Sequence, residues 1–463
     1  MKHSSTQQWV DDDLTELDLG DERRNRRARR IIERFAQRPG ASITSVFENR
    51  AETEATYRLL SNDALEPEAI VAALQRATVD RLADEAVVLV PQDTTCLDFG
   101  SHPAAAGLGP TGGGDGSAGH GLFVHSAIAV SADGVPLGLL HQHSWARDPE
   151  RIGRKHQRKD TRLQDKESHR WLQTARAVEA AVPADKQLIQ IADREGDIFE
   201  LFAIPRRAGS YLLVRAYRQR RLEGEGAELW PTVQAQPVAE GFEMLVHEGA
   251  RRAVRKARLE LRFCPVMVRP PEHGMHDASL TPVALNAIEV REREAPEGAT
   301  PILWRLLTDL PVVGVDDALR CVRYYELRWL IERYHYVLKS GCRIEESQLR
   351  AIDRLERLLA LLSAVALRLL WMTYSARAHG DAPCTVAFSD LEWRVLYQQR
   401  MLKPPPDQPP PLREAVLWLA QLGGFLGRTG DGEPGVKVLW RGLTRLQDIV
   451  IGFLLASQIV RNA

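Results

Sequence analysis

The chain has 463 residues, of which 44% are hydrophobic, and a formal net charge of −1 at pH 7. This length provides for a large core and predicts roughly two to four domains, and the near-neutral charge excludes a uniformly basic nucleic-acid-binding protein. The five cysteines form no CxxC pair, which argues against both a disulfide framework and a cysteine-ligated zinc site.

The N-terminal region reads as helices and turns with one dense basic segment. The segment DERRNRRARR places six arginines on about two helical turns, and helices are also predicted around TYRLL and across EPEAIVAALQRATVDRLA. Such a run is either a solvated helix face or a site for an anion, of which phosphate is the usual one.

The next region has the pattern of a mixed α/β sheet. AVVLVPQDTT predicts a buried strand that ends on Asp93, and FVHSAIAVS and VPLGLLHQHSW predict two strands joined by a turn at Asp133 and Gly134. KESHRWLQTARAVEAAV has the period of an amphipathic helix. QLIQIADREGD predicts a strand running into Asp193, and GSYLLVRAYR a strand ending on Arg215.

Two segments of this region are unusual in composition. The glycine-rich loop 103–119 lacks the Gly-Lys-Ser/Thr ending of a phosphate-binding P-loop, and segment 147–163 is heavily charged. The sequence assigns no role to either.

From Leu222 to Asp309 the pattern is one of repeated strands separated by Pro- and Glu-rich turns, which predicts an inserted β-rich sheet. Further helices are expected in the C-terminal tail. The apolar run LLALLSAVALRLLWM is interrupted by Arg368 and favours a buried interface helix over a membrane span. With no apolar secretion signal at the start, we expect a cytoplasmic protein with no membrane partner.

The segment YYELRWLIERYHYVLKSGC, residues 324–342, predicts a helix with an unusual polar side. At about 100° per residue, four polar side chains share an arc of about 60°. They are Tyr325, Arg328, Glu332 and Lys339. This side is either a solvated face with an Arg328–Glu332 pair or a binding face.

Three carboxylates are candidates for one site. Asp93 and Asp193 follow apolar strands, where side chains of an open α/β sheet project into a crevice, although a single strand-end aspartate is commonly a turn or helix cap. The order of elements allows both to converge with Glu332. Three carboxylates suit Mg²⁺, for which Mn²⁺ can substitute, and a two-ion site supports in-line phosphoryl transfer.

These motifs resemble the DDE-type transposases of bacterial insertion sequences, in the Tn-five-like branch (insertion sequence family four). The helix has that branch's Tyr-Arg-Glu-Lys spacing, and the two aspartates lie in QDTT and ADREGD. The stretches DLGDERRNRR, TEATYRLL, HSAIAVS, WRLLTDLPV and LWRGLTRLQDIVIGFLLA are similar to the family as well, so the resemblance spans nearly the whole chain.

The resemblance implies an α/β fold: an RNase H-like mixed-sheet catalytic core with an inserted β-rich subdomain, flanked by helical N- and C-terminal domains. The expected parts are a DNA-binding domain at 1–80, the first part of the core at 81–221, the insertion at 222–310, the second part of the core at 311–376 and a dimerisation region at 377–463.

The implied activity is cut-and-paste transposition with Mg²⁺. The expected partners are double-stranded DNA, as transposon inverted-repeat ends and as target, and a second copy of the chain in a synaptic dimer that cuts in trans. One strand is nicked, the freed 3′-hydroxyl forms a hairpin, and the reopened end joins target DNA. The implied location is the cytoplasm of a bacterium, associated with the nucleoid.

The resemblance also assigns residues. Asp93, Asp193 and Glu332 are the catalytic metal ligands. Trp304 is at the position that stacks a flipped base, against the alternative that it packs in the core. The other expected DNA contacts are Tyr325, Arg328, Lys339, Arg215, Arg26, Arg27, Arg30 and Arg58. Two alternatives are a transposase-derived DNA-binding regulator without catalysis and a metal-dependent phosphohydrolase of small substrates.

Overall fold

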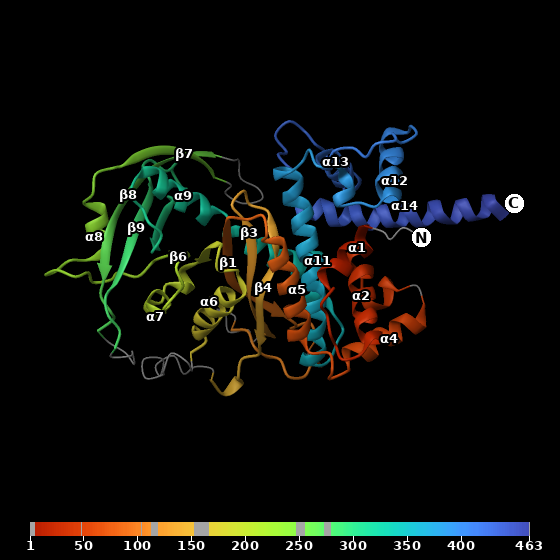
Figure 1. Ribbon diagram of the computed structural model, residues 1–463, viewed down its shortest axis with the longest axis horizontal. Coiled ribbons are helices and arrows are strands. Elements are labelled where there is room, and N and C mark those ends of the chain that lie inside the picture. The colour runs from red at the N-terminus through yellow and green to blue at the C-terminus, as the bar shows by residue number, and fades with distance from the viewer. Residues whose placement is uncertain are drawn as a thin grey trace. The chain divides into compact units, whose positions relative to one another are not determined.

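The computed structural model describes residues 5–47, 49–102, 104–112, 119–151, 166–246, 255–272 and 279–462. These residues form a mixed α/β fold with helical N- and C-terminal regions (Figure 1). The strands pair in the order β2-β3-β1-β5-β6-β10-β9-β8-β7, with β4 beside β3, to make a ten-stranded mixed sheet. Parts of the 103–119 loop and of the 147–163 segment lie outside the described residues.

The chain divides into two compact units. The first unit contains Met1–Glu85, Thr94–Arg151 and Leu330–Ala463, and the second contains Ala86–Asp93 and Ile152–Trp329. Strand β1 (Val87–Asp98) contributes its first half to the second unit and its second half to the first. It therefore continues beyond Asp93, where the sequence predicted its end.

The first unit begins with five helices: α1 (Ser5–Asp13), α2 (Glu22–Gln37), α3 (Ile43–Val46), α4 (Arg50–Leu60) and α5 (Pro67–Arg81). The arginine-rich helix α2 starts where the Asp21 side chain accepts a hydrogen bond from the Arg23 N–H at 2.7 Å. Its apolar side, which includes Ile31, Ile32 and Phe35, is buried. The basic segment is thus one face of an amphipathic helix.

The strands of the first unit are β2 (Gly109–Pro110), β3 (His120–Ser131) and β4 (Pro136–Trp145), followed by the 3₁₀ turn η1 (Pro149–Arg151). β3 and β4 are antiparallel neighbours. Gly134 in the turn between them has a φ of 89°, a conformation that glycine adopts without steric cost. The hairpin predicted at Asp133 and Gly134 is therefore confirmed.

The rest of the first unit is helical. It contains α10 (Trp329–Tyr336, which begins one residue before the unit boundary), the π-helical segment η5 (Val337–Gly341), the 3₁₀ turns η6 (Ile344–Glu346) and η7 (Cys384–Val386), and the helices α11 (Ile352–Ala378), α12 (Asp390–Met401), α13 (Leu412–Leu422) and α14 (Val436–Asn462).

Helix α11 lies in the interior of the first unit. It packs against α2, α5, β4, α13 and α14, and Figure 1 shows it beside α5. By length and composition it is the one helix of the described chain that could cross a membrane, and 83% of its most apolar window is buried. The apolar run around Leu358–Leu370 was expected at an interface between copies. It instead forms core within a single chain.

Arg368 interrupts this apolar helix without disrupting the interior. Its guanidinium lies over the rings of Trp371 and Trp9, at 4.3 and 5.4 Å from their centroids, and donates hydrogen bonds to the carbonyls of Val386 and Ala387. Burial lowers the pKa of Arg368 to about 10, so the side chain stays charged at neutral pH. Stacking and carbonyl acceptors offset the cost of burying that charge.

The second unit holds the remaining strands: β5 (Gln187–Ala192), β6 (Ser210–Arg215), β7 (Glu240–Val246), β8 (Arg255–Val268), β9 (Val283–Glu292) and β10 (Leu303–Thr308). Its helices are α6 (His169–Ala181), the 3₁₀ turn η4 (Arg194–Gly196), α7 (Phe199–Ala203), α8 (Leu229–Gln234) and α9 (Val315–Glu326). Trp171, Phe202, Trp230 and Leu307 belong to its apolar core.

The strands predicted as an inserted sheet continue the sheet of the second unit. β1, β5 and β6 are parallel, and β10 pairs antiparallel with β6, followed by β9, β8 and β7. The β-rich segment is therefore an extension of the same sheet. This outcome needed the β6–β10 pairing, which joins residues about 90 apart and has no local signal in the sequence.

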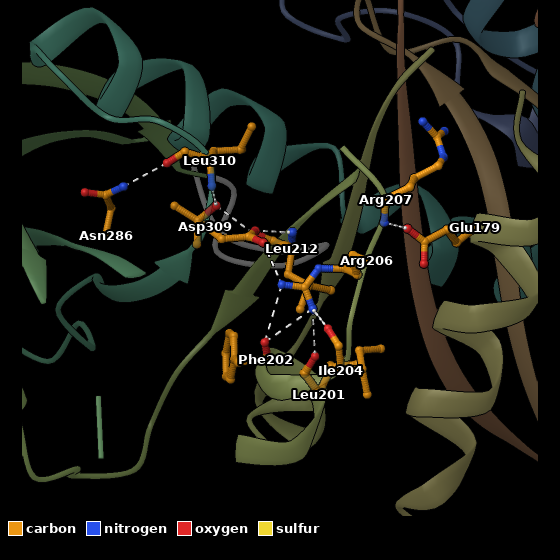
Figure 2. A network of polar contacts seen from close by, with 11 residues as sticks. Glu179, Leu201, Phe202, Ile204, Arg206, Arg207, Leu212, Asn286, Asp309 and Leu310 are labelled. Carbon is orange, nitrogen blue, oxygen red and sulfur yellow. Dashed lines mark hydrogen bonds and ion pairs between the residues drawn. The ribbon is translucent and has the colours of Figure 1, made fainter. Parts of the chain in front are cut away.

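A polar network secures the end of β10 next to β6 (Figure 2). Asp309 accepts hydrogen bonds from the Leu212 N–H at 2.7 Å and from Arg206 at 2.6 Å, and Arg206 also donates to the Leu201 carbonyl. Asn286 of β9 donates to the Leu310 carbonyl at 2.8 Å. These contacts connect β6, β9 and β10 to one another and to α7.

Candidate active site

The two predicted aspartates occupy matching positions on neighbouring parallel strands of the second unit. The last register pair between β1 and β5 is Pro91 with Ile191, and Asp93 and Asp193 each follow two residues later. Paired strands lie ~4.8 Å apart, and residues at one register position face the same side of a sheet. Both aspartates are half-buried. The two aspartates thus follow the paired segments of neighbouring parallel strands, and the convergence of their carboxylates stays a prediction.

Asp193 also serves as a local cap. Its Oδ1 accepts a hydrogen bond from the Glu195 N–H at 2.8 Å, which starts the turn η4 immediately after β5. One oxygen of the Asp193 side chain therefore caps a turn, which is the alternative role considered for an aspartate at the end of a strand. Capping fixes the carboxylate at the sheet edge and is compatible with a second role.

Asp93 is held by Arg328. The distance from Arg328 Nη1 to Asp93 Oδ2 is 3.2 Å, and the two side chains are 10% and 15% exposed. At Arg328, the polar side of the 324–342 segment is therefore covered and does not face solvent. An ion pair this well covered fixes the aspartate in one position and keeps its negative charge balanced.

Tyr325 lies beside this ion pair and is only 4% exposed. The Arg328 guanidinium carbon is 5.8 Å from its ring centroid. Burial raises the pKa of the Tyr325 hydroxyl, while the charges of Arg328 and Arg215 act in the opposite direction. No hydrogen bond of acceptable geometry reaches this hydroxyl from the described residues, although Arg215 is near. A buried, neutral hydroxyl of this kind is suited to donate to an anionic ligand.

Arg215, at the end of β6, adds a second guanidinium. Its Nη2 donates to the Leu303 carbonyl of β10 at 3.1 Å. Burial lowers the pKa of Arg215, and the like charges of Arg194 and Arg328 lower it further. Three arginines therefore act on one another near the two aspartates. Such a cluster favours a bound anion, of which phosphate is the usual one.

Trp304 packs against Tyr325 rather than within the apolar core. The two rings meet edge to face with centroids 5.5 Å apart and an interplanar angle of 70°. The indole is partly buried on β10. Trp304 is therefore partly buried against a buried ring, and its role in base stacking or in packing stays a prediction.

The predicted single helix across residues 324–342 is interrupted. Helix α9 ends at Glu326, Leu327 and Arg328 form a turn, and α10 runs from Trp329 to Tyr336 before η5. The apolar side chains opposite the polar side of the segment are nevertheless mostly covered: Leu327 is partly buried, and Leu330, Ile331, Tyr334, Val337 and Leu338 are buried. The regular helix assumed for the 60° arc was wrong, because a turn at Leu327 and Arg328 separates α9 from α10.

Glu332 and Lys339 belong to the first unit, while the two aspartates belong to the second. Glu332 is half-buried on α10, and the Lys339 ammonium lies 3.4 Å from Glu345 Oε1. Glu345 also accepts the Asp98 N–H at 2.9 Å. The convergence of Glu332 with Asp93 and Asp193 stays a prediction.

Among the described residues, no three His, Cys, Asp or Glu side chains form a group that could hold a metal ion by themselves. The donor chemistry of Asp93, Asp193 and Glu332 does fit a divalent cation, because carboxylate oxygens are the ligands that Mg²⁺ prefers.

The four arginines predicted to bind DNA in the N-terminal region differ in their surroundings. Arg26 and Arg58 are exposed, and Arg27 is half-buried. Arg30 is engaged in ion pairs with Glu33 at 2.9 Å and Glu52 at 3.5 Å.

Other arginines of α2 have internal partners as well. Arg24 donates to the Leu19 carbonyl, and Arg29 to the Leu14 carbonyl at 2.9 Å. Part of the arginine crowding is therefore relieved within the chain, which leaves Arg26 and Arg58 as the more accessible pair for phosphate.

Two regions of the chain match known families. Residues 6–65 match the family described as Transposase DNA-binding, and residues 364–460 match the Transposase Tn5 dimerisation domain. The chain belongs to the Tn5 family of transposases. The DNA-binding match covers most of α1, all of α2–α4 and the arginine-rich segment, and the dimerisation match runs from within α11 into α14. In the sequence, the candidate active-site residues lie between the two matched regions.

Arg194 was not among the predicted site residues, and in the structure its charge acts on Arg215 together with that of Arg328. Its position directly after the strand-end aspartate Asp193 was the signal that could have identified it, because a residue there shares the same edge of the sheet.

Proposed function

We propose that the chain is a cut-and-paste DNA transposase with an RNase H-like catalytic core. It binds transposon ends, cleaves them by metal-dependent phosphoryl transfer through a hairpin, and joins them to target DNA. The observation that carries this proposal is the matched register of Asp93 and Asp193 beside Arg215 and Arg328, in a chain whose flanking regions match transposase DNA-binding and dimerisation families.

Asp93, Asp193 and Glu332 would hold Mg²⁺. When bound, the ions supply activation of the attacking oxygen and charge stabilisation on the leaving oxygen. The capping bond on Asp193 and the Arg328 contact on Asp93 keep these carboxylates oriented before any ligand arrives. Pre-orientation lowers the entropic cost of reaching the reactive geometry.

The basic side chains bind the phosphate that is cut. Arg215 and Arg328 balance its charge, and Tyr325 donates its buried hydroxyl to a phosphate oxygen. In nicking, a water oxygen bonds to phosphorus, the bond from phosphorus to the 3′ oxygen breaks, and a 3′-hydroxyl and a 5′-phosphate result. The same site then serves hairpin formation and joining, because each step exchanges one phosphodiester oxygen for another.

The first prediction tests the three carboxylates. Replacing Asp93, Asp193 or Glu332 by Ala should reduce Mg²⁺-dependent cleavage of duplex DNA that carries a transposon end to which the wild-type protein binds. The loss should be several kcal/mol, more than about 100-fold in rate. Gel-shift binding to the same DNA should persist, because the N-terminal arginines are unchanged.

Asp98→Ala is the matched control, since Asp98 is an exposed carboxylate on the same strand as Asp93. Cleavage by any of the three variants at the wild-type rate would remove that residue from the proposed site. A wild-type protein that binds the ends and never cleaves them would instead be a DNA-binding regulator.

A further inference from the structure

The turn that begins at Asp193 ends at a second aspartate with a different environment. Asp197 is fully buried and forms an ion pair with Arg220. Its Oδ2 accepts hydrogen bonds from the backbone N–H groups of Tyr217 at 3.1 Å and Arg218 at 3.0 Å. The loop that follows β6 is thereby tied to the same short turn that positions Asp193.

The other side of this loop is fixed by helix α8. Trp230 Nε1 donates to the Arg218 carbonyl at 3.0 Å, and the Leu229 N–H donates to the Arg220 carbonyl at 2.9 Å. The Gln219 side chain donates to Glu228 at 2.8 Å. Backbone and buried partners therefore hold residues 217–220 from both sides.

Two side chains on this rigid loop point into solvent. Tyr217 is 55% exposed, and Arg218 is exposed with its guanidinium carbon 5.6 Å from the Tyr217 ring centroid. Arg220, by contrast, is turned toward Asp197. Neither Tyr217 nor Arg218 belongs to the apolar core, and they lie two and three residues after Arg215 in the chain.

An exposed tyrosine ring beside a guanidinium on a fixed backbone has the chemistry to bind an unpaired nucleotide. Every base has a face that stacks on an aromatic ring, and the arginine adds a charge for the phosphate and a cation–π contact. Fixing the loop in advance removes part of the ordering cost of binding.

We propose that Tyr217 and Arg218 bind an unpaired nucleotide of the DNA strand engaged at the Asp93 and Asp193 site. Tyr217 stacks on the base, and Arg218 contacts the phosphate. This inference rests on the proposed function and adds a nucleotide contact distinct from Trp304. The turn η4 connects the catalytic site to this loop, because Asp193 precedes the turn and Asp197, which binds the loop backbone, follows it.

The test uses the full chain and a short oligothymidylate in which one base is 5-iodouracil. After irradiation, mass spectrometry should locate a crosslink in the peptide that contains Tyr217. Tyr217→Ala should abolish this crosslink, and Tyr217→Phe should keep it because the ring remains. Crosslinks found only in other peptides, and unchanged in Tyr217→Ala, would overturn the proposal.

The salt dependence of binding to the same oligonucleotide separates the two roles. Tyr217→Ala should weaken binding about tenfold at every salt concentration, which corresponds to ~1.4 kcal/mol. Arg218→Ala should reduce the slope of log affinity against log salt by about 0.7, the value for one phosphate of a single strand.

Arg221→Ala is the matched control, because Arg221 is an exposed arginine at the end of the same loop and is paired with Glu272 at 2.7 Å. If Arg221→Ala and Arg218→Ala changed the salt dependence equally, the arginines would contribute only general positive charge, and the proposal would be refuted. Cleavage of end DNA is measured in the same preparations. If the wild-type protein forms the crosslink but does not cleave end DNA, only the proposed function is refuted. If the wild-type protein cleaves end DNA and Tyr217→Ala binds the oligonucleotide normally, only the nucleotide contact is refuted.

Discussion

At the scale of single residues, Trp304 has two possible roles that one experiment can distinguish. A tryptophan on a strand is commonly a core residue, and the sequence left both roles open. In the structure the indole is partly buried and meets Tyr325 edge to face, next to Arg215 and Arg328. The ring is therefore placed beside the side chains that we propose bind the cut phosphate.

Trp304→Ala should uncouple nicking from hairpin formation. Nicking needs a held phosphate and the carboxylates, whereas a hairpin requires sharp distortion of the duplex, which an extruded and stacked base relieves. Stacking contributes ~1–3 kcal/mol, so hairpin yield should fall about tenfold or more while nicking stays near normal. Denaturing gels of a labelled end substrate resolve both products. Trp304→Phe is the control that keeps a ring, and a normal hairpin yield in Trp304→Ala would argue for a packing role.

At the scale of elements, the junction of β6 and β10 depends on the ion pair between Arg206 and Asp309 (Figure 2). Arg206→Ala would leave the Asp309 carboxylate without its charged partner, with the hydrogen bond from the Leu212 N–H remaining. Removing one partner of a buried pair costs about 3–5 kcal/mol, and the partial exposure of Asp309 places this case at or below the lower end. Chemical denaturation should show this decrease in the free energy of unfolding. Arg320→Ala is the control, because it removes an exposed pair with Asp317 and should change the free energy of unfolding by about 0.5 kcal/mol or less. Equal stability of the two variants would contradict this account of the junction.

Local patterns in the sequence predicted most individual elements, and contacts between distant residues explain the rest. Apolar runs in the sequence predicted the paired segments of β1 and β5 that precede Asp93 and Asp193, although β1 continues to Asp98. The turn at Leu327 and Arg328 was not predicted, because Arg328 contacts Asp93, which is 235 residues away in the chain.

Two further differences have the same origin. Periodicity cannot distinguish a helix buried within one chain from a helix buried between two chains, so α11 was placed at an interface. At the candidate site, the anchored loop of Tyr217 and Arg218 depends on Asp197, whose burial has no signature in the sequence.

At the scale of the whole molecule, we expect the assembly of two copies to use a surface other than the largely buried α11. The C-terminal part of α14 extends beyond α12 and α13 (Figure 1), and it carries exposed apolar side chains. Phe453, Leu454, Leu455 and Ile459 are 44–69% exposed. Clustered apolar side chains on a surface mark a binding site, and this stretch lies inside the match to the Tn5 dimerisation domain.

The double variant Leu455→Asp with Ile459→Asp should prevent the pairing of two DNA ends. These residues are one turn apart on α14, and burial of each contributes about 1.5–3 kcal/mol, so pairing should weaken at least ~100-fold. Light scattering of the complex with end DNA should then show one protein per end, while gel-shift binding of a single end is kept. If each site cuts the end bound by its partner, cleavage should fall in parallel with pairing. Gln458→Asp adds one negative charge to the same stretch without removing an apolar side chain, and it should pair normally. Wild-type pairing by the double variant would place the dimer contact elsewhere in the 364–460 region.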